Sequence, residues 1–260
     1  MTSEVNVHRF EARSDIDVLY VGPPLSAGPL PTLFYFSLNA KESLCLDPFN
    51  QPVAYLSSLP MRIFSITLPG HEEGLIPTEA LNLWARVSAG GGDPVAMFVE
   101  KVKYVVETLE DQGLLLPGRT AVAGLSRGAF IAAHAAAAIP QFKWILGFAP
   151  LTKLSYAREF EAMAQDPRIE LLGLEHLVDK LIDRSLRFYI GNLDTRISTR
   201  FCFDFIEKLS QAASRNQIRS PNVELIISPS IGRDGHGTSR EVFHQGAQWI
   251  AEQLGAIDVV

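Results

Sequence analysis

The feature that most constrains this chain is the pentapeptide Gly124-Leu125-Ser126-Arg127-Gly128, which fits the pattern G-x-S-x-G. A short β-like run at residues 119–123 precedes it, and an alanine-rich helical run at residues 129–139 follows it as far as Pro140. A serine at such a turn sits in a strained backbone conformation, and the glycines leave room where strand and helix cross. The segment therefore predicts an elbow that raises the Ser126 hydroxyl above the edge of a parallel sheet.

Composition restricts the partners and cofactors that the chain can have. The 260 residues are 47% hydrophobic and carry a formal net charge of −6, which fits a globular protein and argues against a nucleic-acid partner. Cys45 and Cys202 form no metal-binding set with the histidines, and Gly90-Gly91-Gly92 lacks the Lys-Ser/Thr of a phosphate-binding loop, so we expect no metal and no cofactor. Two cysteines, no signal-type N-terminus and no long apolar stretch lead us to expect a cytoplasmic protein without a membrane span.

The order of the predicted elements is that of an α/β protein. Asp93-Pro94 marks a helix start, because Asp can cap the first turn and Pro fits the first helical position. Residues 238–241 read as a capping box that opens the final helix. Strands are predicted at residues 5–12, 16–21, 33–38, 61–68, 119–123, 144–149, 186–190 and 223–227, the first two as an antiparallel pair. Helical segments are predicted within 41–58, from 94 to 112, at 129–139, around 206–213 and at the C-terminal end.

We therefore expect one domain over residues 1–260, built on a mostly parallel eight-stranded sheet with helices on both faces. Residues 151–184 are charge-rich and helical without a strand signal, and they could form a small cap over the edge of the sheet.

With the serine elbow after the middle strand, this order of elements resembles the α/β-hydrolase fold over nearly the whole chain. Gly-Leu-Ser-Arg-Gly followed by small residues is most similar to the dienelactone-hydrolase and prolyl-oligopeptidase-like branch of the serine hydrolases. Leu68-Pro69-Gly70-His71 is similar to a turn that is common after the fourth strand of these enzymes. The resemblance implies an acid at Asp194, after a late strand, and a histidine at His236, before the last helix, in the chain order Ser, Asp, His.

Three side chains are thus candidates for one catalytic unit at the carboxyl edge of the sheet. Ser126 is the candidate nucleophile, and a serine hydroxyl needs a base to take its proton. His236 is the candidate base because imidazole titrates near neutral pH, whereas His134 lies two helical turns beyond Ser126. Asp194 is the candidate acid that fixes the tautomer of His236, with Asp234 as its rival.

The negative charge that develops on a substrate oxygen needs hydrogen-bond donors, which form an oxyanion hole. The resemblance implies the backbone N–H of Arg127 as the first donor. We expect Leu38 to supply the second, although residues 36–39 read Phe-Ser-Leu-Asn where many members carry His-Gly. Two interpretations of the Arg127 side chain stay open: a structural ion pair under the elbow, or a clamp on an acidic group of the substrate.

The expected function is a serine hydrolase that cleaves a small-molecule carboxylic ester through an acyl-enzyme. One alternative is a hydrolase of short peptides or acyl-peptides with the same three residues, and another is a non-catalytic binding module on this fold. Ala129 stands where peptidase members usually have a second glycine after the elbow, which disfavours the peptide substrate.

Overall fold

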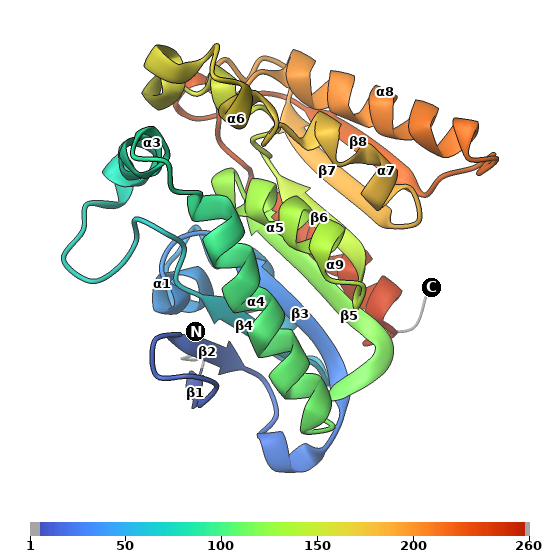
Figure 1. Ribbon diagram of the computed structural model, residues 1–260. Coiled ribbons are helices and arrows are strands. Elements are labelled where there is room, and N and C mark those ends of the chain that lie inside the picture. Colours follow the sequence, from blue (N-terminus) through green and yellow to red (C-terminus); the bar gives the residue numbers. More distant parts are fainter. Residues whose placement is uncertain (1–5, 258–260) are drawn as a thin grey trace.

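All the strands in the described part of the chain join one sheet, in the order β1-β2-β4-β3-β5-β6-β7-β8 (Figure 1). The computed structural model describes residues 6–257, so Val5, where the first predicted strand begins, lies outside the described residues. β1 and β2 are antiparallel, as the sequence predicts, and β2 is also antiparallel to β4, which the sequence does not predict. All the other neighbours are parallel, so the sheet is mostly parallel as expected. The strands are β1 His8–Phe10, β2 Val18–Val21, β3 Leu30–Phe36, β4 Arg62–Ile66, β5 Leu115–Leu125, β6 Phe142–Phe148, β7 Ser185–Gly191 and β8 Val223–Ser228.

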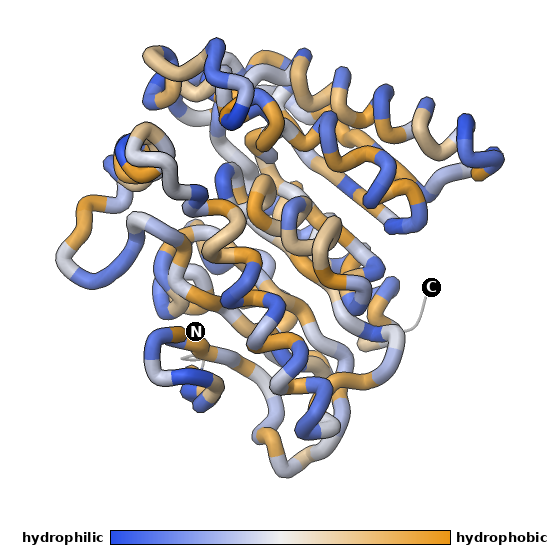
Figure 2. Tube along the Cα trace, viewed as in Figure 1, coloured by the Kyte–Doolittle hydropathy of each residue, from blue (hydrophilic) through white to orange (hydrophobic). Residues whose placement is uncertain are grey.

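Helices cover both faces of the sheet because the strands are apolar on both sides. In β3, Phe34 and Phe36 belong to one core cluster, and Leu33 and Tyr35 to the other, which is the period-two alternation of a strand buried on both faces. The first cluster includes residues of α3 Ala80–Ala89, α4 Pro94–Asp111, α5 Arg127–Ala138 and α8 Thr199–Arg215. The second includes residues of α1 Ala40–Cys45, α2 Gln51–Leu56 and α9 Arg240–Leu254. Figure 2 shows hydrophobic residues along the central strands and hydrophilic ones along the outer side of α8.

The cap predicted for α4 is present. Oδ1 of Asp93 accepts hydrogen bonds from the backbone N–H groups of Val95 (3.0 Å) and Ala96 (2.9 Å), and Pro94 is the first helical residue. These contacts satisfy two donors that the first turn of a helix otherwise leaves without partners.

Two local predictions differ from the structure, and one helix lacks a prediction. α9 is capped by Ser239, whose Oγ accepts from the N–H of Val242 (3.2 Å), so the predicted capping box at Thr238 is wrong by one residue. β5 begins at Leu115 and runs through the expected turn at residues 117–118, where its register against β3 shifts. α3 was not predicted, although its buried Leu81 and Trp84 have helical spacing.

Residues 151–184 contain only short helical segments, in agreement with the absence of a strand signal there. They are the 3-10 helices Leu154–Tyr156, Arg158–Met163 and Leu174–His176, together with α6 Pro167–Glu170 and α7 Val178–Leu181. Whether this segment acts as a cap stays a prediction. Further 3-10 helices occur at Leu25–Ala27, Pro77–Glu79 and Arg233–Gly235. Within residues 6–257, no helix is long and apolar enough to cross a membrane.

Candidate active site

Ser126 stands at the tight turn between β5 and α5, with backbone angles of φ 55° and ψ −118°. Such angles are unusual for a residue with a side chain and store strain that the surroundings must hold in place. A Cβ on Gly124 would lie 2.2 Å from the carbonyl carbon of Gly128, and a Cβ on Gly128 would lie 2.0 Å from the carbonyl oxygen of Phe36. The two glycines of the motif are therefore required by the close approach of α5 to β5 and β3.

The structure brings Ser126, His236 and Asp194 together in one hydrogen-bonded chain. Oγ of Ser126 lies 2.9 Å from Nε2 of His236, and Nδ1 of His236 lies 2.7 Å from Oδ2 of Asp194. Because the Asp194 carboxylate accepts hydrogen bonds, Nδ1 of His236 carries the proton and Nε2 is free to accept the serine proton. This is the geometry that a serine nucleophile and its base require.

Backbone contacts hold Asp194 beside the histidine loop. Its side chain is completely buried, and its other oxygen, Oδ1, accepts hydrogen bonds from the N–H groups of Arg196 (3.0 Å) and Ile197 (3.1 Å). The next residue, Thr195, donates from its N–H to the carbonyl oxygen of Asp234 at 2.9 Å, which ties the loop after β7 to the loop that carries His236. The carboxylate is thus fixed in position before any substrate arrives.

The rival candidates have other partners. The carboxylate of Asp234 pairs with Arg158 (2.9 Å), so it does not orient His236. Nε2 of His134 lies 2.9 Å from the carbonyl oxygen of Leu172, and burial lowers the pKa of this histidine to about 4. His71 is buried at 2% exposure and has no hydrogen-bond partner on either ring nitrogen among residues 6–257, and burial lowers its pKa to about 3.

The two expected oxyanion donors differ in their present contacts. The N–H of Arg127, the first residue of α5, donates to no group in the described part of the chain. The N–H of Leu38 donates to Oγ of Ser43 at 2.9 Å, and the N–H of Ser37 approaches the same oxygen at 3.2 Å. Ser43 is fully buried in α1, so Leu38 borders the cavity while its donor is already engaged.

No family model and no curated protein matches this sequence. Solved structures do match. The acylaminoacyl peptidase of Pyrococcus horikoshii has a TM-score of 0.68 at 15% identity, over 97% of this chain and 41% of that one. A putative dipeptidyl aminopeptidase IV from Bacteroides ovatus has a TM-score of 0.66 at 15% identity, over 96% of this chain and 35% of that one. The S-formylglutathione hydrolase of Agrobacterium tumefaciens has a TM-score of 0.64 at 17% identity, over 96% and 95% of the two chains.

This chain has the α/β-hydrolase fold. It spans 35% and 41% of the two peptidases but 95% of the S-formylglutathione hydrolase, so in length it corresponds to the latter. The sheet order and the position of Ser126 after β5 agree with the fold that the sequence resembles.

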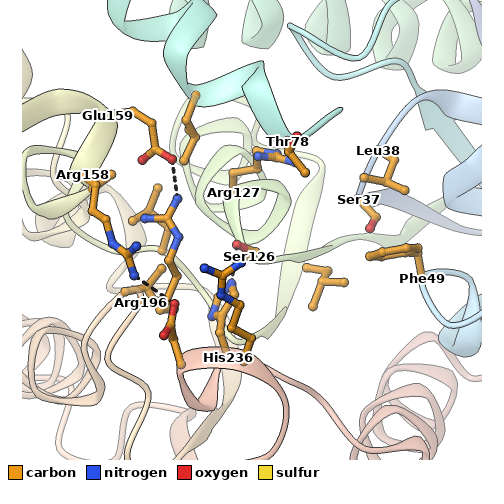
Figure 3. A pocket seen from close by; sticks show the side chains of 17 residues that line it. Ser37, Leu38, Phe49, Thr78, Ser126, Arg127, Arg158, Glu159, Arg196 and His236 are labelled. Carbon is orange, nitrogen blue, oxygen red and sulfur yellow. Dashed lines mark hydrogen bonds and ion pairs between the residues drawn. The ribbon is translucent and has the colours of Figure 1, made fainter. Parts of the chain in front are cut away.

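In this α/β-hydrolase fold, a cavity of about 470 Å³ opens beside Ser126 and His236 (Figure 3). Ser37, Leu38 and Phe49 form one side of it, and Leu151 and Ile197 are among the other apolar residues. The cavity is rich in charge, with four arginines and two acids among its lining residues: Arg127, Arg158, Arg196, Arg233, Glu159 and Asp234.

Sequence reasoning missed most of this charged lining. Arg196 pairs with Glu159 (2.7 Å) across two segments that are 37 residues apart, and Arg158 pairs with Asp234. Of the four charged lining residues that the sequence analysis did not name, two lie close to predicted site residues: Arg196 follows Asp194 by two residues, and Arg233 precedes His236 by three. Glu159 lies in the irregular segment 151–184, where no periodicity predicts the direction of a side chain.

One group of side chains in the described part of the chain has the spacing of a metal site, and it lies away from the cavity lining. Ligand atoms of Glu170, Glu175 and His176 lie within 4.8 Å of one another. Lys153 contacts both carboxylates, at 2.9 and 3.2 Å, and Lys208 contacts Glu175 as well. Protein cations therefore already balance the negative charge of this group.

Proposed function

We propose that the protein is a serine hydrolase that cleaves a carboxylic ester of a small molecule through an acyl-enzyme. The observation that carries this proposal is the hydrogen-bonded chain from Ser126 through His236 to Asp194, at 2.9 and 2.7 Å. It lies at the carboxyl ends of β5, β7 and β8, which is where α/β proteins bind their ligands. An esterase, an S-formylglutathione hydrolase and several peptidases are among the solved structures that share the fold.

In the first half-reaction, Oγ of Ser126 attacks the ester carbonyl carbon while Nε2 of His236 takes the hydroxyl proton. The Asp194 carboxylate stabilises the imidazolium that forms. As the carbonyl π bond breaks, its electron pair moves to the carbonyl oxygen. This oxygen becomes an oxyanion, which the backbone N–H of Arg127 can stabilise. The intermediate then collapses, the bond to the alkoxide breaks, and His236 gives its proton to the leaving oxygen, so that the alcohol departs and the acyl group stays on Ser126.

The second half-reaction repeats these roles with water as the nucleophile. His236 takes a proton from water, the hydroxide oxygen attacks the acyl carbon, and a second oxyanion forms. When it collapses, the bond to Oγ breaks, His236 returns the proton to Ser126, and the carboxylic acid leaves. The three side chains end in their starting protonation states.

The oxyanion donors favour an ester over an amide. Of the two expected donors, the N–H of Arg127 has no acceptor among residues 6–257, whereas the N–H of Leu38 can become a donor to the substrate only if it releases Ser43. An ester has the better leaving group and therefore needs less stabilisation of the intermediate than an amide. Ala129 in place of a second glycine after the elbow also disfavours the peptidase alternative.

A fluorophosphonate probe tests the proposal, because it reacts only with an activated serine. We expect the wild type and a Ser57→Ala control on the exposed end of α2 to be labelled, and Ser126→Ala to remain unlabelled. His236→Ala should abolish both labelling and ester turnover, whereas His134→Ala should keep them. A folded wild type that takes no label would refute the proposal and favour a binding module.

Substrate comparison separates the two hydrolase alternatives. If labelling occurs, turnover of short p-nitrophenyl esters is compared with turnover of aminoacyl-arylamides. We expect the esters to be the better substrates, and a clear preference for the amides would replace the esterase with a peptidase.

A further inference from the structure

Three residues that line the cavity beside Ser126, namely Arg127, Glu159 and Arg196, carry buried polar atoms without partners, and so does His71, which lies outside the lining. Nine buried side-chain nitrogen and oxygen atoms among residues 6–257 have no hydrogen-bond partner, and five of them belong to His71, Arg127, Glu159 and Arg196. Folded proteins leave few such atoms unpaired, so the unpaired atoms of Arg127, Glu159 and Arg196 point to a partner that binds in the cavity. We call these four residues the Arg127 cluster.

The residues of the Arg127 cluster are close enough to affect one another. Arg196 donates to Glu159 at 2.7 Å, and the charges of Arg196 and Glu159 act in opposite directions on the pKa of Arg127. The charge of Arg127 in turn helps to lower the pKa of His71. Figure 3 shows Arg196 joined to Glu159 and Arg127 next to Thr78, both near Ser126.

The Arg127 cluster carries one positive charge that no acid in it balances. Glu159 neutralises Arg196, and His71 is uncharged at neutral pH because burial lowers its pKa to about 3. Arg127 donates from Nη2 to the carbonyl oxygen of Pro77 (3.2 Å), but it pairs with no carboxylate in the described part of the chain. Burial and the charge of Arg196 lower the pKa of Arg127 only to about 10, so it stays protonated. A half-buried cation without a counterion, whose Nε is shielded from water, is unfavourable, and a bound anion would relieve that cost.

We propose that the Arg127 cluster binds a carboxylate of the substrate, so that the site selects esters bearing a negative charge near the bond that is cleaved. This inference rests on the proposed function of Ser126. A guanidinium matches the planar carboxylate with two parallel hydrogen bonds. One unbalanced charge in the cluster suits a carboxylate better than a doubly charged phosphate. Because Arg127 follows Ser126 directly, the bound carboxylate lies close to the reacting carbonyl.

Two matched pairs of esters test this selectivity. Monomethyl glutarate is compared with methyl pentanoate, which places the carboxylate in the acyl part, and 4-acetoxybenzoate is compared with phenyl acetate, which places it in the alcohol part. We expect kcat/KM for the anionic ester to exceed that for the neutral one by about tenfold or more in at least one pair. Arg127→Gln should reduce this ratio to below about threefold, and Arg127→Lys, which keeps the charge, should retain much of it.

The control is Arg240→Gln, which removes a positive charge outside the cavity, from a side chain that is 77% exposed and paired with Asp47. In this variant, the ratio of kcat/KM for the anionic ester to kcat/KM for the neutral ester should stay as in the wild type. The proposal is overturned if neither pair shows a preference, or if Arg127→Gln keeps it.

Calorimetric titration with glutarate separates this proposal from that of the hydrolase. Glutarate should bind the wild type and bind Arg127→Gln about tenfold or more weakly. If Arg127→Gln loses glutarate binding but the wild type takes no fluorophosphonate label, the anion site is supported and the hydrolase is refuted. Labelling without an ester preference and without glutarate binding would refute the anion site alone.

Discussion

At the scale of single residues, the two carboxylates near His236 have different partners. Asp194 accepts the Nδ1 proton of His236, whereas Asp234 pairs with Arg158. We predict that Asp194→Asn lowers kcat for an ester by about four orders of magnitude, because the amide can donate to Nδ1 and stabilise the wrong tautomer. Asp234→Asn, which loses only a partly exposed ion pair, should change kcat little. Steady-state kinetics of both variants check this, and the reverse order of effects would make Asp234 the acid.

Ser43 is the residue whose role is least expected from the sequence. Its hydroxyl oxygen accepts the N–H groups of Ser37 and Leu38 at the end of β3. If the N–H of Leu38 serves as the second oxyanion donor, Ser43→Ala frees it, and we predict that kcat for an ester rises by about threefold or more with little change in KM. The free energy of unfolding should fall by about 1–3 kcal/mol, because two buried donors lose their acceptor.

Ser57→Ala is the matched control for Ser43, since its hydroxyl donates to a carbonyl oxygen within the exposed end of α2. In this control, kcat for the ester and the free energy of unfolding should both stay near their wild-type values. An unchanged or lower kcat in Ser43→Ala would remove Leu38 from the oxyanion hole and leave Arg127 as the donor.

At the scale of the elements, the crossing of α5 over β3 depends on Gly128. A Cβ there would lie 2.0 Å from the carbonyl oxygen and 2.7 Å from the carbonyl carbon of Phe36, which are backbone atoms that cannot rotate away. We predict that Gly128→Ala lowers the free energy of unfolding by about 3 kcal/mol or more, measured by urea denaturation. Gly90→Ala, where the nearest atom to a new Cβ is 3.4 Å away, should have little effect. Equal stability of the two variants would contradict this account of the elbow.

The elements that the sequence predicts are those with a local cause. α4 has its cap at Asp93 and an apolar stripe, and the elbow has its glycines, so both follow from short stretches of residues. β5 begins before the expected turn because pairing with β3 extends the strand, and this pairing is not encoded locally. α3 lacks a side-chain cap, so nothing marks its start in the sequence.

The same distinction applies to the candidate site. Ser126, Asp194 and His236 could be predicted because each follows a predicted strand, and parallel strands place such residues at one edge of the sheet. The ion pair between Arg196 and Glu159 could not, because it depends on how residues 151–184 fold back over that edge. Side-chain direction in such a segment follows from tertiary packing and not from spacing.

At the scale of the whole molecule, the site exists only when the sheet is complete. Ser126 and His236 are 110 residues apart in the chain, and His236 and Asp194 are 42 apart. Their contacts depend on β5, β6, β7 and β8 being aligned in one sheet. Conditions that lower the stability of the fold therefore also disrupt the contacts of the candidate site.

Acid is one such condition, because the fold buries histidines in their neutral form. Burial lowers the pKa of His134 to about 4, against about 6.5 in an unfolded chain. Between these two values the unfolded state binds more protons than the folded state, so the free energy of unfolding decreases as the pH falls from about 6.5 to 4. The loss from His134 alone should reach on the order of 2–3 kcal/mol at the lower end.

We predict that His134→Gln flattens this dependence, since an amide can still donate to the carbonyl oxygen of Leu172 but does not titrate. Urea denaturation of wild type and variant at pH 7, 5.5 and 4.5 measures the difference. His244→Gln, at an exposed position of α9, should leave the slope as in the wild type. If His134→Gln loses stability with acid as steeply as the wild type does, proton uptake at other groups governs the acid response, and His134 is not buried in the neutral form that its contacts imply.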